Sequence, residues 1–187
     1  MNTAKKELSS NSVIFIYISL SIFTATLISH FIPPRADILF FYIVIWLGSF
    51  SLFFFIFKNR IIKALFIIRN KIKKSTGWPT YIKIVNGICW AGPFGLGAVI
   101  PSIHEYLILA GIGLGNLSTF IIFLLKNKIK NIDQLLVGII CLFSIVIVFF
   151  LFYENLIDKP SGEFLARILI SIAYGIGGLY STFIKPE

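Results

Sequence analysis

The residues best suited to chemistry gather in the short turns that separate long apolar runs. On one side of these runs they are His30, Arg35, His104, Glu105, Glu154 and Arg167. Histidine and carboxylate side chains bind metal ions, and histidine also changes charge near neutral pH. Their spacing matches no tight ligand set, which favours structural roles at helix ends. Metal binding, pH sensing and a lipid-modifying reaction are the alternatives.

Inside the apolar runs, the groups that membrane enzymes need are missing. The serines have no histidine or lysine nearby, and the sequence holds no His-Glu-x-x-His, no paired aspartates and no glycine-rich phosphate loop. No Asp, Glu or Lys lies near the middle of a run, where a coupled transporter usually keeps one. The sequence therefore predicts a protein that is not an enzyme and uses no cofactor, and it leaves a passive pore open.

Proline interrupts the third apolar run at Gly92-Pro93-Phe94-Gly95. A proline inside a helix removes a backbone hydrogen bond and clashes with the preceding turn. The favoured interpretation is a packing kink, since proline is common in membrane helices. The alternative is a broken helix that lines a substrate or ion site.

Small and amide residues mark three of the runs as candidates for close packing or for a cavity. They are Asn86, Gly87, Ala91, Pro93, Gly95, Gly111, Gly115, Asn116, Ser118, Gly175, Gly178 and Ser181. Small residues four apart let membrane helices approach closely, and amides form interhelical hydrogen bonds. We expect the third, fourth and sixth helices to pack together, with the first, second and fifth more peripheral.

Long apolar helices must position all these residues. The 187 residues are 57% hydrophobic and only 13% charged, about half the charge of a soluble domain. A helix needs about 20 apolar residues to cross a bilayer. Six stretches qualify, which predicts an all-α integral membrane protein with one transmembrane domain over 1–187. The predicted spans are about 13–33, 38–57, 82–101, 105–125, 134–153 and 164–184.

The basic residues predict the orientation of the spans. Of the 17 Lys and Arg residues, 14 lie in 1–12, 58–83, 126–133 and 185–187, and 3 lie in the alternate turns. Cytoplasmic loops carry the excess of basic residues, so both termini are expected in the cytoplasm, in a multi-pass protein of the cell membrane. The net charge of +9 follows this pattern, which suits anionic lipid better than nucleic acid.

The segment 58–75 is basic and amphipathic. Ile61, Leu65, Ile68 and Ile72 share one helical face, and the other face carries Arg60, Lys63, Lys71 and Lys74. Such a helix suits the inner leaflet, with its basic side chains on anionic headgroups. Binding of a protein partner is the alternative.

Matching segments in the second, fourth and sixth runs indicate a repeated unit. Each contains Gly-x-x-Ser-x-Phe, beginning at Gly48, Gly115 and Gly178. A proline lies 14 residues before the first two of these glycines, at Pro34 and Pro101. We favour three copies of one helical hairpin, and chance similarity between apolar helices is the alternative. The copies would cover about 13–60, 82–128 and 134–185.

In its length, hairpin layout and proline and glycine positions, the chain resembles the HdeD-like acid-resistance membrane proteins. That resemblance implies three short transmembrane hairpins and a stress-linked role in the membrane without a defined reaction.

Taken together, these patterns predict a non-enzymatic polytopic protein that acts by helix association, as a scaffold, an accessory subunit or a stress-response protein. Its partners would be the lipid bilayer and either a second copy or another membrane protein. A small transporter or channel centred on the third helix is the first alternative. A membrane enzyme that uses the outer histidines and carboxylates is the second.

Overall fold

The chain folds into six long helices, each long and apolar enough to cross a membrane. The computed structural model describes residues 10–31, 38–74, 78–128 and 130–183. Within them, the expected all-helical fold with six helices of membrane-spanning length is confirmed. The elements are α1 (Ser10–His30), α2 (Ile38–Lys74), α3 (Thr80–Val99), the 3-10 turn η1 (Pro101–Ile103), α4 (His104–Asn127), α5 (Ile132–Tyr153) and α6 (Lys159–Phe183).

Proline, a left-handed residue and an aspartate define several helix ends. Ile100 precedes Pro101 and leaves the helical region, which ends α3. Lys128 ends α4 with a φ of 53°. At the start of α6, the Asp158 carboxylate accepts a hydrogen bond from the backbone N–H of Ser161 at 3.0 Å. Hydrogen bonds from Ser161 hold the pKa of Asp158 below its usual range.

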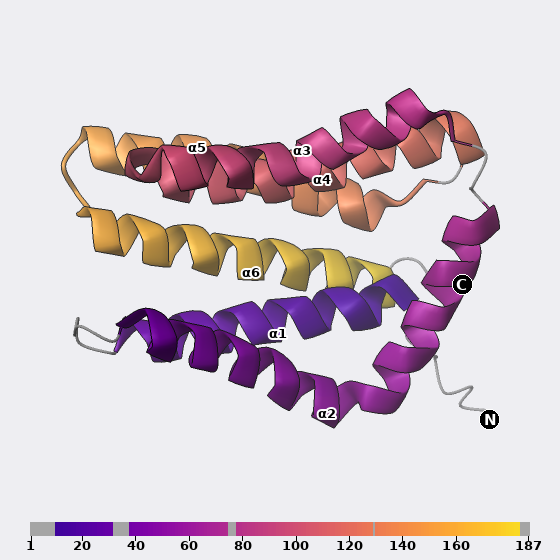
Figure 1. The fold of residues 1–187 in the computed structure, drawn as a ribbon, viewed down its shortest axis with the longest axis horizontal. Helices are drawn as coiled ribbons and strands as arrows, with labels where there is room; N and C mark the ends of the chain where they lie inside the picture. The colour runs from indigo at the N-terminus through magenta and orange to yellow at the C-terminus, as the bar shows by residue number, and fades with distance from the viewer. Residues whose placement is uncertain (1–9, 32–37, 75–77, 129, 184–187) are drawn as a thin grey trace.

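The order in which the helices pack differs from their order in the chain. Figure 1 shows α2, α1 and α6 one above the other, with α3, α4 and α5 overlapping above α6. Neighbouring helices pack in the order α2, α1, α6, α5, α4 and α3, and α4 also contacts α6. Helices α1 and α2, α3 and α4, and α5 and α6 each pack as neighbours. The helix axes run between two ends of the bundle. We call the end that holds Asn11 and Asp133 the inner end, and the end that holds His30 and His104 the outer end.

We expected the third, fourth and sixth helices to form the centre of the bundle. This expectation is wrong for the third helix, α3. Helix α3 packs against α4 and η1 and has no other substantial neighbour among the described residues. Helix α1, expected at the periphery, packs against α6 and α2, and α5 packs against α4 and α6. The bulky side chains of α1 and α5 explain the difference, because they fill the space above glycines of α6 and α4.

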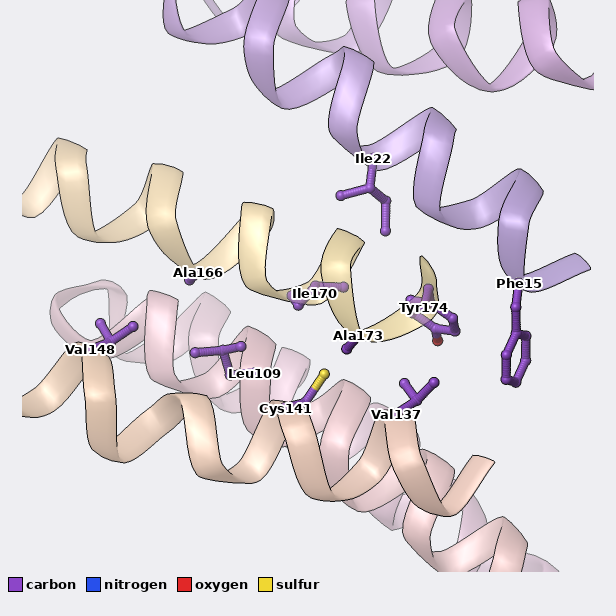
Figure 2. Close-up of a cluster of buried hydrophobic side chains, with 10 residues drawn as sticks. All are labelled: Phe15, Ile22, Leu109, Val137, Cys141, Val148, Ala166, Ile170, Ala173 and Tyr174. Carbon is purple, nitrogen blue, oxygen red and sulfur yellow. The ribbon is translucent and has the colours of Figure 1, made fainter. Parts of the chain in front are cut away.

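The core lies between α1, α4, α5 and α6. Figure 2 shows side chains from these four helices pointing toward one another. Its buried members are Phe15, Ile22, Leu109, Val137, Cys141, Val148, Ala166, Ile170, Ala173 and Tyr174. The rings of Phe15 and Tyr174 meet edge to face, with centroids 5.3 Å apart. No core residue comes from α3, which is a peripheral helix of this bundle.

Helix α2 joins the second predicted span and the amphipathic segment into one helix of 37 residues. Figure 1 shows that it turns near its middle and that its second half lies across the inner end. Ile61 and Ala64 are buried there beside Val13 of α1. Ile61 shares the apolar face of the amphipathic segment, and it packs beside α1. Leu65 of the same face is exposed.

Candidate functional site

The two faces of α3 have different surroundings, and the first of them binds α4 through polar side chains. The Asn86 side-chain oxygen accepts hydrogen bonds from the hydroxyls of Ser118 at 2.7 Å and Thr119 at 3.1 Å. The indole N–H of Trp90 donates to the Thr119 hydroxyl at 3.1 Å. The structure thus brings the predicted residues Asn86 and Ser118 together, as an interhelical hydrogen bond rather than as the lining of a cavity.

Aromatic rings of α3 cover the glycines of α4. The Trp90 ring lies against Gly115, and the Phe94 ring lies against Gly111. A Cβ atom at Gly111 would lie 2.6 Å from the Phe94 ring, closer than packed atoms approach. The small residues of α4 therefore act as predicted, by admitting large side chains from a neighbouring helix.

The second face of α3 carries the predicted small residues, and no described residue lies over its glycines. Gly87, Ala91 and Gly95 are exposed. A Cβ atom at Gly87 or Gly95 would have no heavy atom within 4 Å, apart from its own helix backbone. We call these three residues the open α3 face. The prediction that they pack in the centre of the bundle is wrong.

Helix α3 continues without interruption through Pro93. The side chain of Pro93 is buried. A broken helix at this position, which the transporter hypothesis needs, is therefore absent from the described structure.

Helix α6 uses its small residues inside the bundle. A Cβ atom at Gly178 would lie 2.8 Å from Cγ1 and 3.2 Å from the backbone nitrogen of Ile16 in α1. Near Gly175, Ser19 of α1 and Ser171 of α6 exchange hydrogen bonds, each hydroxyl donating to the other residue's carbonyl at 2.8 and 2.9 Å. This close approach joins α1 to α6 along most of their length.

The amide of Asn116 lies in the core between α4 and α6. It donates to the Tyr174 hydroxyl at 3.3 Å and to the Ile112 carbonyl at 2.9 Å. Asn116 was predicted as an interhelical hydrogen-bonding residue, and this contact agrees with that role.

Three helices meet at Asp133, a buried carboxylate that the sequence patterns did not single out. Asp133 lies in the first turn of α5 and is 2% exposed. One oxygen, Oδ2, accepts hydrogen bonds from the Asn11 amide at 2.6 Å and from the Ser181 hydroxyl at 3.1 Å. The other oxygen, Oδ1, is buried without a hydrogen-bond partner. The sequence feature that could have indicated this residue is its place directly before an apolar run. The basic segment before it has the composition of a solvated loop, which concealed its burial.

Burial makes the charge of Asp133 costly. Removing a carboxylate from water costs several kcal/mol, and a place at a helix N-terminus returns about 2 kcal/mol at most. The hydrogen bonds from Asn11 and Ser181 offset a further part. Because Oδ1 has no hydrogen-bond partner, part of the desolvation cost of the carboxylate is not offset.

The outer polar residues do not converge on one site. His30 stacks on Phe164, with ring centroids 4.3 Å apart, and His104 packs beside Gly97. Arg167 pairs with Glu163 at 3.3 Å, as their spacing predicts, and Glu154 is exposed. Arg35 lies outside the described residues. Among the residues described, no three His, Cys, Asp or Glu gather into a metal site.

Glu105, expected in a surface turn, is 2% exposed in the first turn of α4. Its Oε2 atom has no hydrogen-bond partner. The expectation is wrong because helix α4 begins at His104, so Glu105 already lies on a packed helical face, one turn before the core residue Leu109.

The basic residues expected at lipid headgroups lie on the second half of α2. Arg60 and Lys63 are exposed there. The side chains of Lys71 and Lys74 lie outside the described residues.

Comparison with known proteins yields no relative. No family model matches this sequence, and no curated protein or solved structure matches it.

Proposed function

We propose that this chain is a non-enzymatic polytopic membrane protein that acts by lateral association, as a scaffold, an accessory subunit or a stress-response protein. The observation that carries the proposal is the open α3 face, where Gly87, Ala91 and Gly95 are exposed and no helix of the described residues lies over the two glycines. Lipid supplies no hydrophobic drive between helices, so close packing along such faces drives their association.

The first partner that we propose for this face is a second copy of the chain. Among the described residues, helix α3 has no substantial neighbour besides α4 and η1, so another molecule can reach it. Two small-residue faces can approach each other with their backbones in contact, which gives a self-complementary, two-fold symmetric interface. Another membrane protein with a large side chain for the Gly87 position is the competing partner.

Cysteine cross-linking in native membranes tests the proposal. In a chain that carries Cys89→Ser and Cys141→Ser, we expect Ala91→Cys to form a disulfide-linked homodimer. Cysteine at Ile139, an exposed position on α5, is the control and should remain monomeric. A monomer in both variants, with no cross-linked partner of any mass, contradicts lateral association through α3.

Leucine substitution of matched glycines adds a second test. Gly48 in α2 and Gly87 in α3 both have open space where a side chain would lie. Gly87→Leu should abolish the dimer, because the side chain separates the two backbones. Gly48→Leu adds the same bulk to α2 and should leave the dimer intact. Equal loss in both variants would indicate a general packing defect instead.

A small transporter is the second candidate, and the two buried carboxyl groups favour it. Asp133 lies at the inner end and Glu105 at the outer end, and intramembrane acids often mark ion pathways. Between them the core is packed with apolar side chains such as Leu109 and Val137. Flux of monovalent cations into liposomes that contain the protein would support this function, provided that Asp133→Asn abolishes it.

We also propose that the inner end faces the cytoplasm, with both termini there and the second half of α2 on anionic lipid. The exposed basic side chains Arg60 and Lys63 support this orientation. Cysteines placed at Lys128 and Glu154 lie at opposite ends of the bundle. In intact cells, an impermeant thiol reagent should label only the cysteine at position 154.

A further inference from the structure

The second half of α2 packs on the bundle through one face and exposes apolar side chains on the next. Ile61 and Ala64 are buried beside Val13 of α1. One residue farther along the helix, Ile62 and Leu65 are 49% and 50% exposed. Successive residues of an α-helix are about 100° apart around its axis, so these exposed side chains lie to the side of the contact with α1.

The exposed apolar side chains belong to a stripe that has a basic residue at each end. Lys58, Ile62, Leu65 and Arg69 follow one another at intervals of four, three and four residues, which places them along one side of the helix. All four are exposed. We call these four residues the α2 stripe. Phe66, which is 63% exposed, lies beside it.

The length of α2 indicates what meets this stripe. About 20 helical residues cross a bilayer, and α2 has 37, so the helix continues beyond its membrane span. Its second half turns and lies across the inner end of the bundle (Figure 1). The stripe therefore follows directly on a membrane span, at the depth where the apolar part of the bilayer gives way to the headgroups.

The charge of this half of α2 indicates which headgroups it meets. Residues 58–74 contain no Asp or Glu. Basic residues beside a membrane span are attracted to anionic phospholipids. Lysine and arginine side chains can extend to the phosphates, while apolar side chains of the same helix enter the boundary between headgroups and acyl chains.

We infer that the α2 stripe inserts into the leaflet at the inner end, where Lys58 and Arg69 bind the phosphate groups of anionic phospholipids. Ile62 and Leu65 enter the acyl boundary, while the neighbouring face keeps its contact with α1. The segment is thereby held between protein and lipid. This inference rests on the proposed placement of this half of α2 on anionic lipid, and it identifies the face and the side chains that make the contact.

Fluorescence quenching in liposomes tests the contact. The full chain, with Cys89→Ser and Cys141→Ser, receives one NBD-labelled cysteine at Ile62, at Leu65, or at the exposed control residues Asn59 and Asn70 of another face. The liposomes are phosphatidylcholine, with or without phosphatidylglycerol, and carry a doxyl quencher on the acyl chains near the headgroups. We expect several-fold stronger quenching at positions 62 and 65 than at 59 and 70, with a difference that grows with phosphatidylglycerol.

Charge removal tests the phosphate contact. With the label at position 62, combined Lys58→Gln and Arg69→Gln should remove the effect of phosphatidylglycerol on quenching. Combined Lys126→Gln and Lys128→Gln is the matched control, because it removes the same charge from exposed residues at the end of α4. This control should leave the effect unchanged.

Three results would overturn the inference. The first is equal quenching at all four labelled positions, and the second is a phosphatidylglycerol effect that survives removal of both stripe cations. The third is a label on the stripe that is shielded from water and from the doxyl lipid alike, which would assign the stripe to a protein partner. The quencher is present in both leaflets, and the assay uses isolated chains at low density. Neither a reversed orientation nor a failure of association through α3 would therefore change the result.

Discussion

Along α6, Gly177 and Gly178 lie against α5 and α1, whereas along α3, Gly87 and Gly95 lie against open space. Both helices carry small residues at spacings that favour helix packing. The difference arises from the neighbours: Ile16 of α1 lies over Gly178, and no described helix covers the open α3 face. A small-residue stripe therefore shows that a helix can be approached closely, and it does not say whether the partner belongs to the same chain.

Among substitutions of these glycines, we expect the largest loss in the free energy of unfolding at Gly178. In Gly178→Ala, the new methyl group would overlap Ile16, and the Ile16 backbone leaves little room to retreat. We expect a loss of about 1–3 kcal/mol in the free energy of unfolding, the usual cost of overpacking. Unfolding of the purified protein in mixed micelles measures it. An unchanged free energy would mean that α1 does not lie against α6 as described.

A smaller loss is expected at Gly115, where the obstacle is a side chain. Gly115→Ala would displace the Trp90 ring and weaken its hydrogen bond to Thr119. We expect a loss of about 1–2 kcal/mol, toward the lower end of overpacking costs because the ring can rotate away. A double-mutant cycle with Trp90→Ala should show a coupling of at least about 0.5 kcal/mol. Strict additivity would indicate that the two residues are not in contact.

The polar contact of α3 with α4 should contribute less. Asn86→Val removes the acceptor for Ser118 and Thr119, although both hydroxyls also donate to the Gly115 carbonyl. We expect a loss of about 0.6 kcal/mol and at most about 1.7 kcal/mol, the average and the maximum for hydrogen bonds between membrane helices. The same unfolding assay applies. A gain in stability would show that Asn86 serves something other than the α3–α4 contact.

The smallest effect on the folded chain is expected at Gly87. Gly87→Ala places its methyl group in open space, so the free energy of unfolding of the monomer should change by less than about 0.5 kcal/mol. A gain is the more natural direction, because alanine favours helix more than glycine does. A clear loss in dilute detergent, where the chain is monomeric, would mean that another part of the chain covers this face.

Two acidic residues, Glu105 at the outer end and Asp133 at the inner end, also have surroundings that depend on the tertiary structure. Glu105 and Asp133 both follow a turn in the sequence and look like surface acids. Both are buried, because each lies in the first turn of a helix on its packed side. Asn11 and Ser181 are far from Asp133 in the chain, so their hydrogen bonds to it could not be anticipated from spacing.

The six helices, their approximate bounds and the all-helical fold could be predicted from composition and hydropathy alone, because a long apolar helix satisfies its own backbone hydrogen bonds. The α3–α4 contacts of Asn86 and Ser118 also agree with their sequence prediction. Continuity of α3 through Pro93 was harder to judge, since a proline can bend a helix without ending it.

The order in which the helices pack could not be predicted from the sequence. Nor could it be predicted which small residues a neighbouring helix would cover and which it would leave exposed. Apolar helices offer one another many similar surfaces, and the choice depends on which bulky side chains meet which glycines. Here Ile16, Trp90 and Phe94 make that choice through contacts between separate helices. The sequence thus determined that the open α3 face would be small enough for close packing, and only the tertiary structure decided that no helix of this chain would cover it.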